Sequence, residues 1–138
     1  MKQEMKRIPT ISLMIPLSAL LFAVASCSTE PPGQRYVNGS AVTYVGTSEY
    51  NNKVSRFKVN PEQAWRLLAE HIRKEKNVPA SRNVLVGLSL SILVEDSYQF
   101  HYKQKVGGIP LAGYYVDGNT GEVEFKQVEG SVPYPYQH

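Results

Sequence analysis

The strongest periodic segment of the chain begins at Asn60 and repeats apolar residues at helical spacing. Asn60 is able to cap the first turn, Pro61 suits the first helical position, and Gln63 completes the residue pattern of a capping box. Lysines near the end of the segment and the Asn77-Val78-Pro79 stretch suit a helix C-terminus. The pattern predicts an amphipathic helix of about four turns, whose apolar face comprises Ala64, Trp65, Leu68, Ala69 and Ile72.

From Val84 the period changes to two, which is typical of strands with one buried face. The pattern predicts a hairpin with a three-residue loop, Glu95-Asp96-Ser97, because that loop brings apolar residues opposite one another. His101 then lies at the surface, on the face opposite the aromatic residues. The expected pairs are Val94 with Tyr98, Ile92 with Phe100, and Leu90 with Tyr102.

A second hairpin is indicated by the turn sequence Asp117-Gly118-Asn119-Thr120-Gly121. Its expected register places Tyr114 opposite Phe125, both buried beneath the helix, and Val116 opposite Val123 in the same way. Tyr115 then lies opposite Glu124 on the outer face of the sheet.

These elements predict an α+β fold, in which one amphipathic helix packs on a four-stranded antiparallel sheet of hairpins. We assign the domain to residues 53–130 and expect its first residues, 53–59, to form a short strand. The Pro- and Tyr-rich residues 131–138 predict a flexible tail. Residues 27–52 hold many turn-forming residues and predict a flexible tether, although 41–50 have some β character.

The N-terminus has the layout of a secretory signal. Lys2, Lys6 and Arg7 form a positive region, and an apolar run interrupted by prolines leads to small residues before the cysteine. A transmembrane anchor is the rival interpretation, but the run is shorter and more interrupted than the roughly 20 apolar residues that span a bilayer. We therefore assign residues 1–26 to a signal peptide.

The stretch Leu21-Phe22-Ala23-Val24-Ala25-Ser26-Cys27 resembles the lipobox of bacterial lipoproteins. The resemblance implies cleavage after Ser26 and acylation of Cys27, both on its sulfur and on its new amino group. Several acyl chains, palmitate among them, would anchor the protein stably to a membrane. In such lipoproteins Asp after the cysteine retains the protein in the inner membrane, and here the residue is Ser28. The resemblance therefore implies delivery to the outer membrane, with the inner membrane and the cell surface as the alternatives.

Residues 57–128 resemble the PepSY-type family of small secreted bacterial domains. The resemblance rests on Asn60-Pro61-Glu62-Gln63-Ala64 at the helix start and on the Tyr114–Val123 segment, which contains Asp-x-x-Thr-Gly-Glu-Val. It implies a fold similar in shape to cystatins and a role in binding or restraining peptidases, or as a periplasmic binding module. The Gly-Gly-Ile-Pro connection after residue 106 departs from that pattern.

Composition excludes some function classes. The chain has 138 residues, 15 cationic and 12 anionic side chains and one cysteine. Without residues 1–26 it keeps 12 cations against 11 anions, so we expect no nucleic-acid partner. A single cysteine excludes an internal disulfide and a multi-cysteine zinc site. His71 and Glu75 share a helix face, but two ligands do not make a metal site.

We find no nucleophile–base motif and no phosphate loop, and we therefore expect neither catalytic residues nor a cofactor or metal. The leading hypothesis is a lipid-anchored envelope protein whose domain faces the periplasm and binds another envelope protein. The candidate contact residues are His101, Tyr115 and Glu124 on the outer sheet face. The alternatives are an inhibitor or immunity protein against a peptidase or toxin, and a small hydrolase with unrecognised residues.

Overall fold

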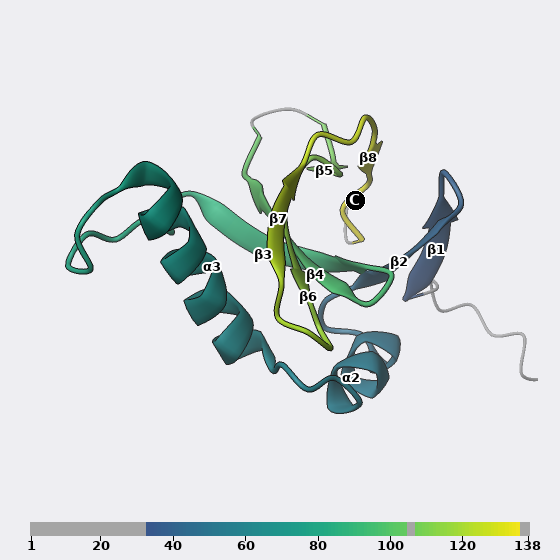
Figure 1. The fold of residues 1–138 in the computed structure, drawn as a ribbon. Helices are drawn as coiled ribbons and strands as arrows, with labels where there is room; N and C mark the ends of the chain where they lie inside the picture. Colours follow the sequence, from purple (N-terminus) through teal and green to yellow (C-terminus); the bar gives the residue numbers. More distant parts are fainter. Residues whose placement is uncertain (1–32, 105–106, 136–138) are drawn as a thin grey trace, which may run out of the picture. The chain divides into compact units, whose positions relative to one another are not determined.

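The computed structural model describes residues 33–104 and 107–135. The predicted signal peptide, Cys27 and the first part of the tether lie outside the described residues. The α+β class and the antiparallel sheet are confirmed, but the sheet has six strands in the order β1-β2-β3-β4-β6-β7 (Figure 1). These strands are β1 (Gln34–Val37), β2 (Ser40–Tyr44), β3 (Leu88–Val94), β4 (Ser97–Tyr102), β6 (Gly113–Asp117) and β7 (Val123–Lys126).

The predicted helix is confirmed as α3 (Pro61–Lys76). Its capping box is complete, because the Gln63 N–H donates to the Asn60 side chain and the Asn60 N–H donates to the Gln63 side chain, each at 2.8 Å. Asn77 ends the helix in a left-handed conformation with φ 54°. The buried face of α3 consists of Ala64, Leu68, Ala69 and Ile72.

A second helix, α2 (Ser48–Ser55), occupies residues that we assigned to the tether and to a short strand. Thr47 caps it, since the Thr47 side chain accepts a hydrogen bond from the Tyr50 N–H. Tyr50 is buried and joins the core on the same side of the sheet as α3. The expected strand at 53–59 is therefore wrong.

Strands β1 and β2 also lie in the predicted tether, and they form a hairpin around Asn38-Gly39. Both turn residues have positive φ, 52° and 82°, which is the backbone of a type I′ turn. This turn matches the right-handed twist of the flanking strands. Residues 34–44 therefore form two strands of the sheet and not part of a flexible tether.

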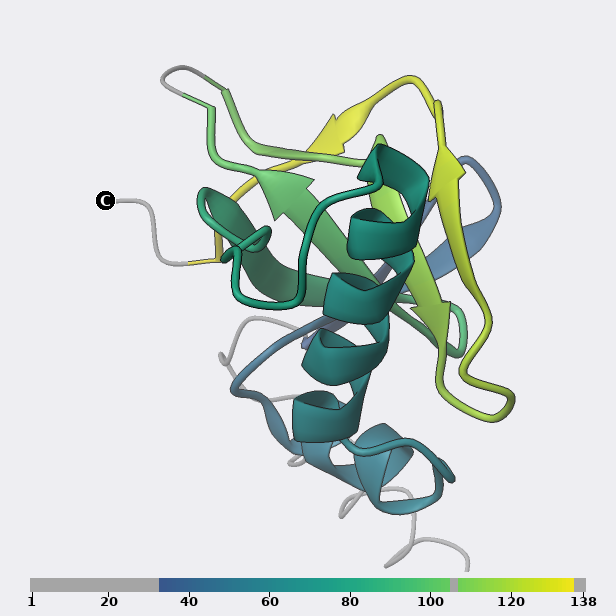
Figure 2. The ribbon, with the colours of Figure 1, turned by 60° about the vertical axis from the view of Figure 1, so that its left-hand side comes forward.

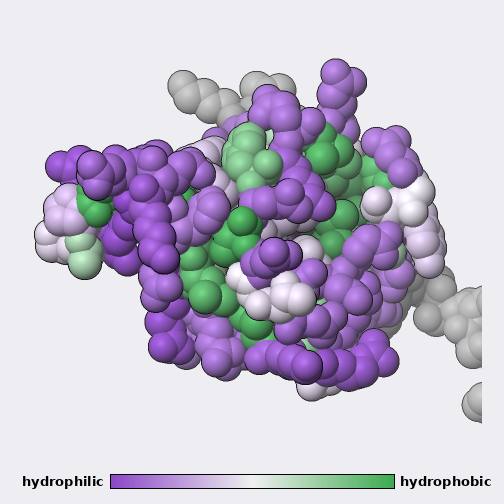
Figure 3. Space-filling view, in the orientation of Figure 1, coloured by the Kyte–Doolittle hydropathy of each residue, from purple (hydrophilic) through white to green (hydrophobic). Residues whose placement is uncertain are grey.

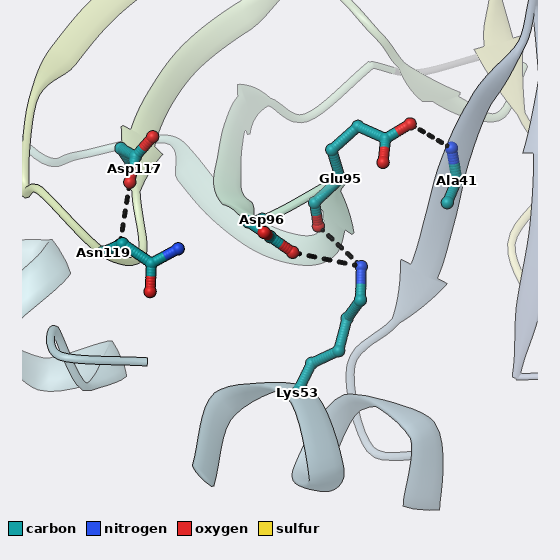
Figure 4. A network of polar contacts seen from close by, with 6 residues as sticks. All are labelled: Ala41, Lys53, Glu95, Asp96, Asp117 and Asn119. Carbon is teal, nitrogen blue, oxygen red and sulfur yellow. Dashed lines mark hydrogen bonds and ion pairs between the residues drawn. The ribbon is translucent and has the colours of Figure 1, made fainter. Parts of the chain in front are cut away.

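The β3–β4 hairpin has a different register from the predicted one. A two-residue turn, Glu95-Asp96, pairs Val94 with Ser97 and Leu93 with Tyr98. Glu95 adopts φ 50°, and the surrounding contacts hold it there. Its carboxylate accepts the Ala41 N–H at 2.9 Å and its carbonyl accepts from Lys53 Nζ of α2 at 2.9 Å (Figure 4).

The register of β3 against β4 shifts between Leu90, which pairs with Phe100, and Ile92, which pairs with Gln99. Leu90 packs against the α3 side of the sheet, whereas Ile92, two residues later, belongs to the core on the opposite side. The extra residue, Ser91, shifts the alternation by one, as a β-bulge does. A pattern of period two cannot reveal this change of face.

The β6–β7 register is confirmed in full, with Tyr114 opposite Phe125, Tyr115 opposite Glu124 and Val116 opposite Val123. The Asp117 carboxylate accepts the backbone N–H groups of Asn119 and Thr120 at 2.8 and 2.9 Å, which closes the turn (Figure 4). These bonds favour the charged carboxylate and lower the pKa of Asp117.

Apolar cores lie on both faces of the sheet, whereas the sequence predicted one. On the first face α3 and α2 cover the side chains of Leu93, Tyr98, Phe100, Tyr114 and Val116. On the second face a two-stranded sheet of β5 (Ile109–Pro110) and β8 (Ser131–Val132) covers Val42, Tyr44 and Ile92. Figure 2 shows α3 on the near side of the sheet, with β5 and β8 beyond it.

The predicted flexible tail at 131–138 is corrected for its first residues. Val132 is 1% exposed, and the carbonyl of Pro133 accepts a hydrogen bond from the Tyr44 hydroxyl at 2.8 Å. Residues 136–138 lie outside the described residues.

Candidate functional site

The three candidate contact residues do not share one surface. His101 is 1% exposed and Tyr115 is 5% exposed, because β5 and the chain that follows it cover this face. Only Glu124 is exposed, with 68% of its side chain accessible. The expected surface position is therefore wrong for His101 and Tyr115, and correct for Glu124.

His101 lies in a polar arrangement that holds β5 against the sheet. Its Nδ1 is 3.0 Å from Gln99 Oε1, and Gln99 Nε2 donates to the carbonyls of Pro110 and Ala112 at 2.8 and 3.2 Å. Burial lowers the pKa of His101 by disfavouring the charged ring. The arrangement binds two layers of the protein together and leaves His101 out of reach of a partner.

Tyr115 has a similar structural role. Its hydroxyl donates to the Leu111 carbonyl at 2.7 Å, and burial raises its pKa to about 12. The ammonium group of Lys126 lies 4.9 Å from the centre of the Tyr115 ring, which is a cation–π distance. Lys126 thus covers the ring from the side of β7.

The His71–Glu75 pair on α3 is present, with Nε2 and Oε2 3.2 Å apart. The Tyr114 hydroxyl donates to the other oxygen of Glu75 at 3.3 Å. Burial, followed by the Glu75 charge, raises the pKa of Tyr114 to about 12. In the part of the chain that the structure describes, no group of three or more potential ligands could hold a metal ion.

One candidate surface for a partner is the outer edge of β7, which is the last strand of the sheet and has no further strand beside it among the described residues. Three of its four residues are exposed, and Phe125 is 48% exposed although it is aromatic. The Phe125 ring packs on the Tyr114 ring at 5.0 Å, edge to face, so its orientation is defined. Apolar side chains reach the surface in the interval between α3 and β7 (Figure 3).

The backbone of β7 also presents hydrogen-bonding groups that no other strand of the described residues contacts. The Asp117 N–H donates to the Glu122 carbonyl at 2.9 Å, and bonding alternates along an antiparallel pair. Glu124 and Lys126 therefore turn their backbone groups toward β6, whereas Val123 and Phe125 turn theirs to the open edge. Such an edge is a template for one more strand.

The side chains along β7 divide between the two faces. Glu124 and Lys126 lie on the second face, where Lys126 Nζ is 3.5 Å from Glu124 Oε1. A polar hollow of about 200 Å³ lies beside them, lined in part by Ser97, Tyr115 and Glu122. Side chains of an added strand would alternate between this hollow and the Phe125 side.

The opposite edge of the sheet, β1, is also unpaired among the described strands. Its Tyr36 is 74% exposed and lies opposite Ala41 in the β1–β2 pair. Unlike Phe125, Tyr36 has no aromatic partner in the described part of the chain. The β7 edge is therefore the better-defined surface.

Sequence reasoning missed this site for a specific reason. It identified Glu124 and the β7 register, but it placed Phe125 in the core because Phe125 alternates with polar residues. The signal that could have revealed the exposure of Phe125 is its place in the chain. β7 is the second strand of the last predicted hairpin, and no segment with alternating apolar residues follows it to cover its outer edge.

Comparison of the chain with family models, curated proteins and solved structures finds no match. No helix in the described residues is long and apolar enough to cross a membrane.

Proposed function

We propose that this protein is a lipid-anchored lipoprotein of the bacterial outer membrane, facing the periplasm, and that it binds another envelope protein by accepting an extended strand at the edge of β7. The anchor is proposed from the lipobox-like residues ending at Cys27. The binding mode is proposed from the open edge of β7 and the half-exposed Phe125.

The binding mode is proposed mainly because apolar cores lie on both faces of the sheet, whereas the β7 edge is open. The cores on both faces are covered by the protein's own helices and strands, so a partner cannot reach the central strands without displacing part of this cover. An edge needs no such displacement. In strand addition the main-chain hydrogen bonds supply affinity, and side-chain sites on alternate faces supply selectivity. Phe125 and the hollow beside Glu124 fit these two kinds of site.

The test uses the full chain in its own cells, with a photoreactive phenylalanine analogue in place of Phe125. We expect crosslinking to protein at this position and none from the matched control at Glu62, which is exposed on α3. A Phe125→Pro variant then tests the strand geometry, because proline removes the outward N–H and leaves the bonds to β6 intact.

The control for Phe125→Pro is Phe125→Ala, which removes the same ring but keeps the N–H. Binding through strand addition requires the proline variant to bind more weakly than the alanine variant. Equal binding by the two variants, or crosslinking from Glu62 as strong as from position 125, would contradict the proposed mode.

A further inference from the structure

The β7 edge is complementary to a second copy of itself. We propose that two copies of this protein associate through antiparallel pairing of β7 with β7, with Phe125 opposite Phe125 on the two-fold axis. This inference rests on the function proposed above and names the partner strand at the same edge.

The hydrogen-bonding groups fit this register. Residues that pair at the centre of an antiparallel contact exchange both backbone bonds only when their N–H and C=O groups point toward the partner. Phe125 and Val123 meet this condition, since the backbone groups of Glu124 and Lys126 are bonded within the β6–β7 hairpin. A two-fold axis at Phe125 therefore forms both bonds without disturbing the sheet.

Charge then selects one register from those that the backbone allows. With Phe125 on the axis, Glu124 of each copy lies opposite Lys126 of the other, so two ion pairs form on the second face. A shift that centres the axis on Glu124 places two carboxylates opposite each other, and an axis at Val123 places Glu124 opposite Glu122. Like charges directly opposite are unfavourable, and opposite charges are favourable.

The other edge lacks this self-complementarity. On β1 the residues that point outward are Gln34 and Tyr36, because the Gly33 carbonyl and the Tyr44 N–H are bonded at 2.9 Å and the pattern alternates. An axis at Tyr36 places Arg35 opposite Val37 and forms no ion pair. An axis at Arg35 places two guanidinium groups together. Self-association through β1 is therefore disfavoured.

The contact is short, since β7 has four residues. Contacts of this size belong to weak and transient interfaces. Anchoring both copies to one membrane raises their effective concentration, which allows a weak contact to be populated. The association is accordingly expected on a membrane and not in dilute detergent solution.

The first experiment is disulfide trapping of the full-length lipoprotein in vesicles of phosphatidylethanolamine and phosphatidylglycerol. Paired residues that exchange both bonds have Cα atoms about 5.5 Å apart, within disulfide range. Phe125→Cys should give a covalent dimer under mild oxidation. Asn119→Cys, exposed at the tip of the same hairpin, and the wild type, with Cys27 alone, should not. Equal dimer yields from the three proteins would overturn the proposal.

The second experiment exchanges the charges and measures energy transfer between labelled copies in the same vesicles. Glu124→Lys and Lys126→Glu each place like charges opposite one another, and each should weaken association about tenfold. The double variant restores both ion pairs and should recover wild-type association. A double variant as weak as the single variants would show that the partner is not a second copy.

The two proposals fail in different ways. If the photoreactive group at position 125 crosslinks to a different protein and Phe125→Cys gives no dimer, self-pairing is wrong and the binding module stands. If position 125 crosslinks neither to a second copy of this protein nor to a different protein, the proposed function itself is wrong. A dimer with the charge-exchange pattern supports self-pairing and the use of the β7 edge for strand addition, with a second copy in the place of a different envelope protein.

Discussion

The Nδ1 atom of His101 lies 3.0 Å from Oε1 of Gln99, and this contact fixes where the histidine carries its proton. The amide nitrogen of Gln99 donates to the carbonyl of Pro110 at 2.8 Å, so its oxygen is left to accept a hydrogen from Nδ1. Nε2 is then unprotonated. It is buried and has no hydrogen-bond partner within the described residues.

The stability of the domain should therefore fall as the pH drops below about 6.5, the ordinary pKa of histidine. Burial lowers the pKa of His101 in the folded protein, so between that lower value and 6.5 only the unfolded chain takes up the proton. The stabilisation is complete above this range and is lost within it. Denaturant titrations from pH 8 to pH 5 measure the loss.

His101→Gln supplies the control, because its amide is able to donate to Gln99 and does not titrate. The variant should have a flatter dependence on pH across the same range. The Asp117 carboxyl does not contribute to the pH dependence between pH 8 and pH 5, since its pKa lies below the ordinary 3.8. An unchanged slope in His101→Gln would show that another group is responsible.

Replacing Tyr115 should be much more damaging than replacing Phe125. Tyr115→Ala removes a buried ring and the hydrogen bond to Leu111, and we expect a loss of about 3–5 kcal/mol in the free energy of unfolding. Phe125→Ala shortens a side chain that is 48% exposed and should cost about 1 kcal/mol. Denaturant titration of both variants decides the order, and the reverse order would place Tyr115 at the surface.

Gln99→Leu should destabilise the attachment of β5 to the sheet. It leaves His101 Nδ1 and the Pro110 carbonyl without their partner, and each buried polar group so left costs about 1–3 kcal/mol. Gln104→Leu, at an exposed position, is the matched control and should change stability little. Hydrogen exchange should show the largest loss of protection in β5 and β8. A uniform loss over the whole domain would contradict this local role.

Lipidation is expected to depend on Cys27. Cys27→Ala removes the sulfur that receives the diacylglyceryl group, so the precursor should stay uncleaved and unacylated. Intact mass of the protein from the envelope fraction measures this directly, and a mature wild-type mass without added lipid would refute the anchor. Ser28→Asp should keep the lipid and move the protein toward the inner membrane.

The sequence predicted the elements whose signals are local. The capping residues around Asn60 and the turn at Asp117 act within a few residues of themselves, and both α3 and the β6–β7 register are confirmed. The β1–β2 hairpin was equally local. Its Asn38-Gly39 pair is a strong type I′ signal, but the polar residues around it also fit the composition of a tether.

The remaining features depend on distant contacts. The alternation in β4 correctly separates Phe100 from His101, but it cannot tell whether the second face meets water or another layer. That layer is made by β5 and β8, two short segments with no periodicity of their own. For the same reason Ser91 could not be recognised as a bulge, since its carbonyl accepts the N–H of Val45, a residue far earlier in the chain, at 3.0 Å.

The position of β8 in the chain also determines when the domain is complete. The second core joins Val42, Ile92 and Ile109 to Val132, and β8 follows every other helix and strand of the described domain. Ribosomes and export channels release a chain from its N-terminus onward. The apolar side chains of β2 and β3 on this face therefore stay accessible to chaperones and proteases until Val132 has emerged, so a prematurely terminated chain would be recognisable as unfinished.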